Sequence, residues 1–347
     1  MKKFSSKKTM AFAVCFCLLC FASTGYAAPQ YTIKFSLHIA PTEEVYSYAA
    51  ALYFKTLVEA KSQGRIAVQL FPSNQLGSER ESLEGLQMGT HQMDFTSTGA
   101  VPSFAPEVQC LAMPYLFASR AVAWEVFDGD FGREIIESVA NKTGMRILGI
   151  SENGIRHFVT TKKQVKSVAD LKGLKIRTME NPAHMIMVKA LGANPTPIAW
   201  GELYTALQQG VVDGYELPLP LIDVVKLYQV SKFVILDGHI YDPYFLWINQ
   251  TFYNQLPADL KAIVDEAAVE TTVVERAKAA YYDNVSAVKS LEKNGMTIYA
   301  PTADEDAEFR KIAQQAVSTF ISEKIGTEWN EKLDRAIEAA KKKIAQK

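Results

Sequence analysis

The sequence predicts an α/β protein of two domains, joined by a chain that crosses between them. A length of 347 residues is too great for one ordinary core and suits roughly two domains. Strand-like and helix-like segments alternate through about residue 150 and then begin again, which predicts two α/β units. No proline occurs from Ala258 to Leu291, so we expect a long helix there that lies across both domains.

The first 27 residues have the pattern of a secretory signal peptide. A basic start at Lys2–Lys8 is followed by an apolar run at Met10–Ala22 and by small residues that favour cleavage near Ala27. The run is too short to span a hydrocarbon core of ~30 Å. A lipoprotein signal at Cys20 is the alternative, although leucines precede this cysteine where that signal requires a small residue. We therefore expect export with cleavage.

The charge and cysteine content of the mature chain argue against a nucleic-acid-binding protein and against a protein stabilised by disulfides. Cleavage removes four of the 37 Lys and Arg residues and none of the 38 Asp and Glu residues, so 33 − 38 leaves a net charge of −5. An acidic surface argues against a nucleic-acid partner. Cys110 is then the only cysteine, which rules out an internal disulfide, and its apolar neighbours predict a buried hydrophobic role.

The first unit opens with an alternation of apolar and polar residues, the pattern of a strand. Ser78, with Glu81 three residues later, forms a capping box at the start of a helix. The alternation of segments predicts a largely parallel sheet. In order, we expect a strand at 31–37, a helix at about 43–60, a strand at 66–71, a helix from 78 and a short strand at 93–95.

The second unit repeats this pattern from residue 157. Pro182 suits the first turn of a helix, and Gly210 suits the end of another. We expect strands at 157–160 and 174–177, helices at 167–171, from 182 and at 200–209, and an extended segment at 195–197. A strand at 244–249 is expected to return the chain to the first sheet, and amphipathic helices are expected at 302–321 and 328–344.

A search for catalytic motifs gives nothing that supports an enzyme. The sequence has no Gly-x-Ser-x-Gly elbow, no Gly-x-Gly-x-x-Gly loop and no phosphate-binding Gly-x-x-x-x-Gly-Lys loop. No two of the five histidines have the His-x-x-x-His spacing of a metal site, so we expect no metal and no cofactor. Ligand sites of two-domain α/β proteins lie in the cleft between the domains.

Arg177 is the most informative polar residue. It ends an apolar strand, and ligands of α/β proteins bind beyond the carboxyl ends of the strands. A guanidinium group there can hold a carboxylate by two parallel hydrogen bonds. The alternative is a structural salt bridge, and the local sequence favours neither.

Three blocks around this arginine carry a family resemblance. The segments at 173–177, 190–197 and 202–214, which read GLKIR, ALGANPTP and ELYTALQQGVVDG, closely resemble the solute-binding subunit of tripartite ATP-independent periplasmic (TRAP) transporters, DctP type. The segments at 75–81 and 111–117 and the long helix after Pro257 agree. The resemblance covers essentially all of the mature chain.

The resemblance implies a two-lobed periplasmic binding protein, similar to class II, with a hinge and a long helix that spans both lobes. Lobe I would contain residues 28–151 and about 241–281, and lobe II residues 152–240 and about 282–347. The protein would be periplasmic and a monomer, and would carry out no covalent chemistry. It would deliver a small carboxylate to one small and one large membrane subunit, driven by an ion gradient.

The resemblance also implies site residues. The arginine that holds the ligand's carboxylate would be Arg177, with Arg156 as its support. Trp200 would place an aromatic ring against the ligand, although core packing is the alternative. On lobe I, His38, Glu79 and Thr98 fall at positions that present polar side chains to the ligand, although His38 could equally pack within the lobe.

The sequence departs from the family pattern at one site position. The usual Gln-Glu-Asn-Pro ending is replaced by Tyr-Glu-Leu-Pro, so Leu217 stands where an asparagine donates to the ligand. A polar ligand group against this leucine would stay unpaired, at about 1–3 kcal/mol. We therefore expect a monocarboxylate, a 2-keto or 2-hydroxy acid, with an apolar or aromatic tail. The alternatives are a C4-dicarboxylate or a sugar acid, a periplasmic enzyme with a two-domain cleft, or a sensor subunit that feeds a histidine kinase.

Overall fold

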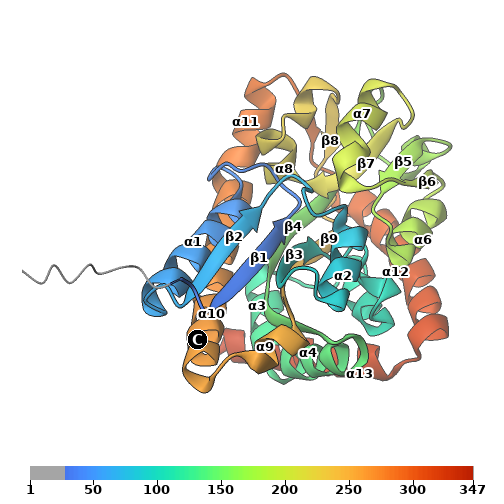
Figure 1. Ribbon diagram of the computed structural model, residues 1–347. Coiled ribbons are helices and arrows are strands. Elements are labelled where there is room, and N and C mark those ends of the chain that lie inside the picture. Colours follow the sequence, from blue (N-terminus) through green and yellow to red (C-terminus); the bar gives the residue numbers. More distant parts are fainter. Residues whose placement is uncertain (1–27, 347) are drawn as a thin grey trace, which may run out of the picture.

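The computed structural model describes residues 28–346, which form two α/β lobes that share one sheet (Figure 1). The expected signal peptide and its cleavage site lie outside the described residues. The path of the ten-stranded sheet is β2-β1-β3-β9-β4-β7-β5-β6, and β8 and β10 extend it from β4. Helices cover the sheet in both lobes (Figure 1).

The first lobe begins with the five elements that the sequence predicts, and β1 pairs in parallel with β2 and with β3. The Ser78 hydroxyl accepts from the Glu81 amide and the Glu81 carboxylate accepts from the Ser78 amide, so the expected capping box is confirmed. The elements are β1 (Tyr31–Leu37), α1 (Tyr46–Lys61), β2 (Ile66–Phe71), α2 (Glu79–Met88), β3 (Met93–Ser97), the 3₁₀ turns η1 (Val101–Ser103) and η2 (Pro106–Ala112), α3 (Arg120–Asp128) and α4 (Asp130–Thr143).

Two long strands connect the lobes. β4 (Met145–Thr160) is antiparallel to β9 (Ile240–Asn249) for most of its length, and the two together form the centre of the sheet. β9 pairs with β3 in the first lobe, which confirms the expected return strand. Because β9 is antiparallel to β3 and β4, and β4 to β7, the sheet is mixed rather than largely parallel. β4 carries the chain into the second lobe and β9 carries it back, so these two neighbours run in opposite directions.

The second lobe follows the predicted order, with additional short elements. Its strands β5, β6 and β7 are parallel neighbours, and β7 is antiparallel to β4. The elements are α5 (Val168–Leu171), β5 (Lys175–Thr178), α6 (Pro182–Ala190), β6 (Asn194–Pro197), the 3₁₀ turn η3 (Trp200–Glu202), α7 (Leu203–Gln208), β7 (Gly214–Pro218), α8 (Leu219–Val224), the 3₁₀ turn η4 (Leu227–Gln229) and β8 (Phe233–Ile235).

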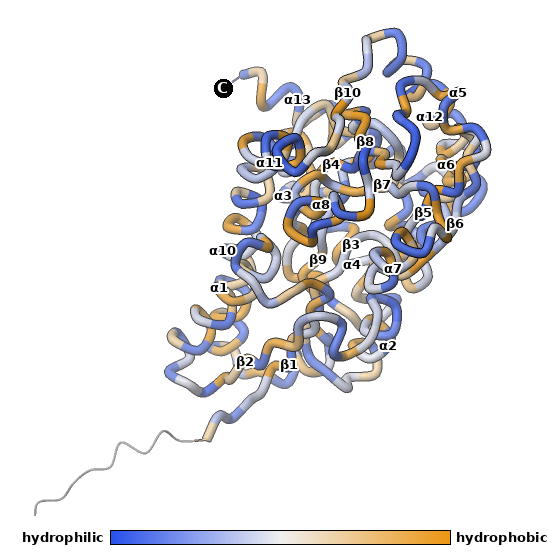
Figure 2. The backbone as a smooth tube through the Cα atoms, turned by 90° about the horizontal axis from the view of Figure 1, so that it is seen from above, coloured by the Kyte–Doolittle hydropathy of each residue, from blue (hydrophilic) through white to orange (hydrophobic). Residues whose placement is uncertain are grey.

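The expected long helix is present and joins the two lobes. After α9 (Gln250–Gln255), the chain continues through α10 (Ala258–Tyr281), a π-helical turn η5 (Tyr282–Ala287) and α11 (Val288–Lys293). Leu260 and Val264 of α10 pack in the core of the first lobe, whereas Ala287 and Leu291 pack in the core of the second. α1, α10 and α11 lie along one side of the molecule in both views (Figures 1 and 2).

The C-terminal helix requires a correction to the expected division of the chain. β10 (Thr297–Tyr299) pairs with β8, and α12 (Ala303–Ile325) packs on α6 of the second lobe. However, α13 (Glu328–Ala345) returns to the first lobe, where Leu333 and Ile337 join the core formed by α3 and α4. The apolar face of this helix is covered there, so the tail past residue 327 is not part of the second lobe. Within residues 28–346, no helix is long and apolar enough to cross a membrane.

Candidate functional site

A cavity lies between the lobes, where β4 and β9 cross from one to the other. About 330 Å³ of space lies between the residues of its wall, part of it open to solvent. Both lobes and both crossing strands contribute to its wall. The lining residues are His38, Ile39, Glu79, Ser97, Asn153, Arg156, Arg177, Met179, Trp200, Leu217, Leu221 and Tyr244.

Arg177 reaches this cavity from β5 and is incompletely paired. Its side chain is fully buried, and its Nε donates to the carbonyl oxygen of Ile198 at 2.9 Å. Both terminal nitrogens, Nη1 and Nη2, are buried without a hydrogen-bond partner. Burial lowers the pKa of Arg177 to about 10, so the group is still charged at neutral pH. A buried, charged donor pair with no acceptor is costly and is complementary to an incoming anion.

Arg156 also lines the cavity, but its guanidinium group is engaged by protein acceptors. Its Nε donates to the Glu216 carboxylate, its Nη2 to the Glu216 carbonyl oxygen at 2.7 Å and its Nη1 to Asp242 at 2.7 Å. Burial alone would raise the pKa of Glu216, but Arg156 holds it well below its usual range. Arg156 therefore joins β4 to β7 and β9 and has fewer free donors than Arg177.

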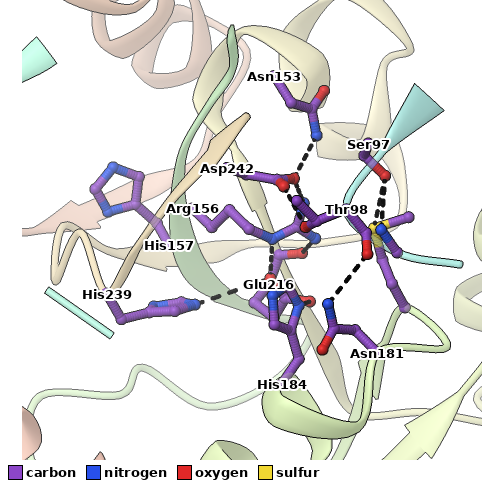
Figure 3. Close-up of polar contacts among 12 residues, drawn as sticks. Ser97, Thr98, Asn153, Arg156, His157, Asn181, His184, Glu216, His239 and Asp242 are labelled. Atoms are coloured by element: carbon purple, nitrogen blue, oxygen red, sulfur yellow. Dashed lines mark hydrogen bonds and ion pairs between the residues drawn. The ribbon is translucent and has the colours of Figure 1, made fainter. Parts of the chain in front are cut away.

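A buried polar cluster surrounds this ion pair (Figure 3). His184 and His239 lie on the Glu216 carboxylate, each with a nitrogen 3.8 Å from an oxygen. Burial lowers the pKa of His239, but Asp237, 2.7 Å away, raises it to about 9. Charged groups from β4, β7 and β9 and from the loop before β9 thus offset one another behind the cavity, in the region where the lobes join. Among the described residues, no group of His, Cys, Asp and Glu side chains is arranged to hold a metal ion.

His38 brings a third positive charge to the cavity, this one from the first lobe. Its Nε2 lies 3.0 Å from the Asp94 carboxylate, and its Nδ1 lies 2.8 Å from the Asn74 side-chain oxygen. Burial lowers the pKa of His38, but Asp94 more than offsets this and raises it to about 9. The backbone oxygen of His38 accepts a hydrogen bond from the indole nitrogen of Trp200 at 3.0 Å, which connects the two lobes over the cavity.

Glu79 faces the cavity as expected, but Thr98 does not. The Ser97 hydroxyl donates to the Glu79 carboxylate at 3.1 Å, and burial raises the pKa of Glu79. Thr98, the residue after β3, is not among the lining residues, and its hydroxyl donates to Asp242 at 2.6 Å. Neighbouring residues of an extended chain point to opposite sides. Ser97, one position earlier, therefore takes the place in the wall that the sequence pattern assigned to Thr98.

The remaining wall is largely apolar. Leu217 is buried and lines the cavity, and the partly buried Trp200 lines it as well. The sequence pattern did not single out Ile39, Met179 and Leu221, the other apolar members of the wall. It also missed Asn153 and Tyr244, because the crossing of β4 and β9 that brings them together has no local sequence signal.

The chain matches known proteins over most of its length. Residues 37–324 match the family model for DctP, the bacterial extracellular solute-binding protein family 7. The chain belongs to the DctP family. A solute-binding protein of this kind from Verminephrobacter eiseniae is 41% identical over 273 residues, which are 78% of this chain and 80% of that protein.

Solved structures of TRAP periplasmic solute-binding proteins share the two-lobed fold. One from Bordetella, whose ligand density was interpreted as pantoate, is 33% identical, with a TM-score of 0.82 over 87% of this chain and 98% of that one. One from Polaromonas, bound to D-erythronate, is 34% identical, with a TM-score of 0.82 over 88% of this chain and 98% of that one. This DctP protein is therefore a TRAP solute-binding protein, and its family is periplasmic.

Proposed function

We propose that the protein captures a small organic acid by its carboxylate at Arg177 and delivers it to the small and large membrane subunits of a TRAP transporter. The observation that carries this proposal is the buried Arg177 guanidinium, whose two terminal nitrogens have no protein acceptor. Both nitrogens can donate to the two oxygens of one carboxylate. Arg156 supports this contact by fixing β4, β7 and β9 around it.

The ligand is a monocarboxylate with an apolar part, a 2-hydroxy or 2-keto acid. Leu217 and Leu221 line the cavity on the same side as Arg177 in the second lobe, with no hydrogen-bonding group of their own. The ligand density of the solved relative from Bordetella was interpreted as pantoate, a small 2-hydroxy monocarboxylate, whereas the relative from Polaromonas is bound to D-erythronate, a sugar acid that supports the second candidate below. Pantoate also has a branched apolar centre, which fits the apolar wall.

A sugar acid is the second candidate, and the first-lobe wall favours it. Glu79 and Ser97 face the cavity and can hydrogen-bond to hydroxyl groups. A ligand with hydroxyls along its length would satisfy these side chains but would leave one hydroxyl against Leu217. The two candidates therefore differ in the chemistry that they place beside this leucine.

Thermal unfolding with a panel of acids separates these candidates. We expect branched or aromatic 2-hydroxy and 2-keto acids to raise the melting temperature most, because a ligand that binds only the folded state stabilises it. Mass spectrometry of the ligand that co-purifies should find such an acid intact. Stabilisation by dicarboxylates or uronic acids alone would contradict the monocarboxylate proposal, and conversion of the acid would contradict a transport role.

The Leu217→Asn variant is the matched test of the apolar wall. We expect this variant to bind branched acids more weakly and polyhydroxy acids more tightly, because the asparagine amide can donate a hydrogen bond where leucine cannot. The control is Leu221→Met, which preserves an apolar wall of similar volume. An unchanged order of ligands in Leu217→Asn would show that this residue does not set specificity.

A further inference from the structure

Exposed apolar side chains gather on one face of the long helix that joins the lobes. Of the seven large apolar residues exposed in the described chain, four lie on α10 and η5, and a fifth, Tyr53, lies on the neighbouring α1. The four are Val269, Val273, Tyr281 and Val285, which are 62%, 59%, 58% and 49% exposed. Contiguous exposed apolar residues of this kind mark an interaction surface.

These residues form a single ridge with a symmetric order. Their positions are four residues apart, and exposed Ala277 fills the gap between Val273 and Tyr281. Residues four apart form one of the ridges by which helices pack against each other. Val273 and Tyr281 are each four residues from Ala277, and Val269 and Val285 are each eight, so the small residue stands at the midpoint. We call these five residues the hinge-helix ridge.

We propose that the hinge-helix ridge binds a second copy of this chain, with the twofold axis at Ala277. A twofold interface places the same surface of both copies in contact, residue i against j and j against i. Val273 then faces Tyr281 of the partner subunit. Each step of four residues turns an α-helix by about 40°, so Val269 and Val285 lie at the two sides of this contact rather than at its centre. The alanine at the centre lets the two helices approach closely where they cross.

The charges beside the ridge favour this antiparallel pairing. Exposed Asp265 precedes the ridge by one turn, and exposed Lys289 follows it by one turn. Glu266, beside Asp265, is already paired with Lys61 of the same chain. An antiparallel copy brings the acidic end of each helix to the basic end of the other, whereas a parallel copy would place like charges together. Rim charges of this kind set orientation more than affinity. Charge complementarity therefore favours a second copy in this orientation.

The size of the contact predicts a weak dimer. One pair of crossing helices buries less than the ~1,200 Å² of a standard protein interface, which is the range of transient complexes. α10 packs on the first lobe and η5 on the second, so each copy would contact both lobes of its partner. The proposed association is therefore reversible, and it differs from the monomer that the family resemblance implies.

A cysteine placed at the proposed twofold axis tests the geometry of the interface directly. Cys110 is fully buried, so Ala277→Cys gives the mature chain a single accessible thiol. A residue on a twofold axis meets its own copy, and we expect mild oxidation of the mature protein to give a disulfide-linked dimer. Val211→Cys is the control, because Val211 is 46% exposed on the loop after α7. No dimer with Ala277→Cys, or equal dimer with the control, would overturn the proposal.

Paired charge variants test the orientation without relying on a crosslink. Val273→Glu and Tyr281→Lys should each weaken self-association about tenfold or more by sedimentation velocity, as loss of central apolar contacts does. An equimolar mixture should regain association, because Glu at 273 in one copy meets Lys at 281 in the other. Unchanged melting temperatures would show that both variants fold. Single variants that associate normally, or a mixture no better than either alone, would rule out this interface.

Discussion

Arg156 and Arg177 have the same side chain and the same complete burial, but their surroundings give them different roles. Arg156 is neutralised by Glu216 and Asp242, which arrive from β7 and β9, whereas the terminal nitrogens of Arg177 have no acceptor. The sequence could place both arginines at the site because each stands in a recognisable strand motif. It could not tell which one is paired, because the acceptors of Arg156 lie 60 and 86 residues away in the chain.

His38 gives a residue-scale prediction about pH. Its pKa is raised to about 9 by Asp94, so the ion pair stabilises the folded state fully below pH 6.5 and loses this contribution as the pH rises through 9. The contribution is on the order of 3 kcal/mol at about 1.4 kcal/mol per pKa unit. Urea unfolding of the wild type and His38→Gln should therefore show a gap in stability at pH 6 that narrows towards pH 10. A constant gap would mean that His38 is not charged in the folded protein.

At the scale of elements, patterns among neighbouring residues were sufficient to predict strands and helix caps. Contacts between segments that are distant in the chain could not be predicted in this way. The strands β1 and β2 and the capping box at Ser78 are found as predicted, because alternation and capping depend only on near neighbours. β4 was expected only at its end, since Gly149 and Gly154 interrupt the apolar pattern at its two bulges. The amphipathic pattern of α13 predicted a helix but could not indicate which lobe would cover its apolar face.

The start of α6 gives the element-scale prediction. Asn181 caps this helix by accepting from the Ala183 amide, and its side-chain nitrogen donates to the Thr98 carbonyl oxygen of the other lobe at 3.1 Å. Asn181→Asp keeps the cap, because Asp and Asn cap equally well, but loses the donor to Thr98. We expect ligand affinity to fall by about 1–2 kcal/mol by calorimetry while the ligand-free melting temperature holds. Unchanged affinity would show that this contact does not support lobe closure.

At the scale of the whole molecule, the cavity is a product of two lobes in contact. The bond from Trp200 to His38 and the contact of Ser97 with Met179 both cross the cleft. A ligand that touches both lobes favours the closed arrangement by its greater affinity for it. In the proposed binding mode, closure would also remove water from the carboxylate and so strengthen its pairing with Arg177.

The central claim is that Arg177 binds the ligand and does not stabilise the fold. The Arg177→Met variant distinguishes these two roles. Removal of a buried charge without a partner should leave the ligand-free protein as stable as the wild type or more so. The measurement that decides is calorimetric titration of the co-purifying acid into the wild type and Arg177→Met. We predict a loss of ~2–5 kcal/mol, roughly 30- to several-thousand-fold in affinity. Wild-type affinity in Arg177→Met would contradict the claim.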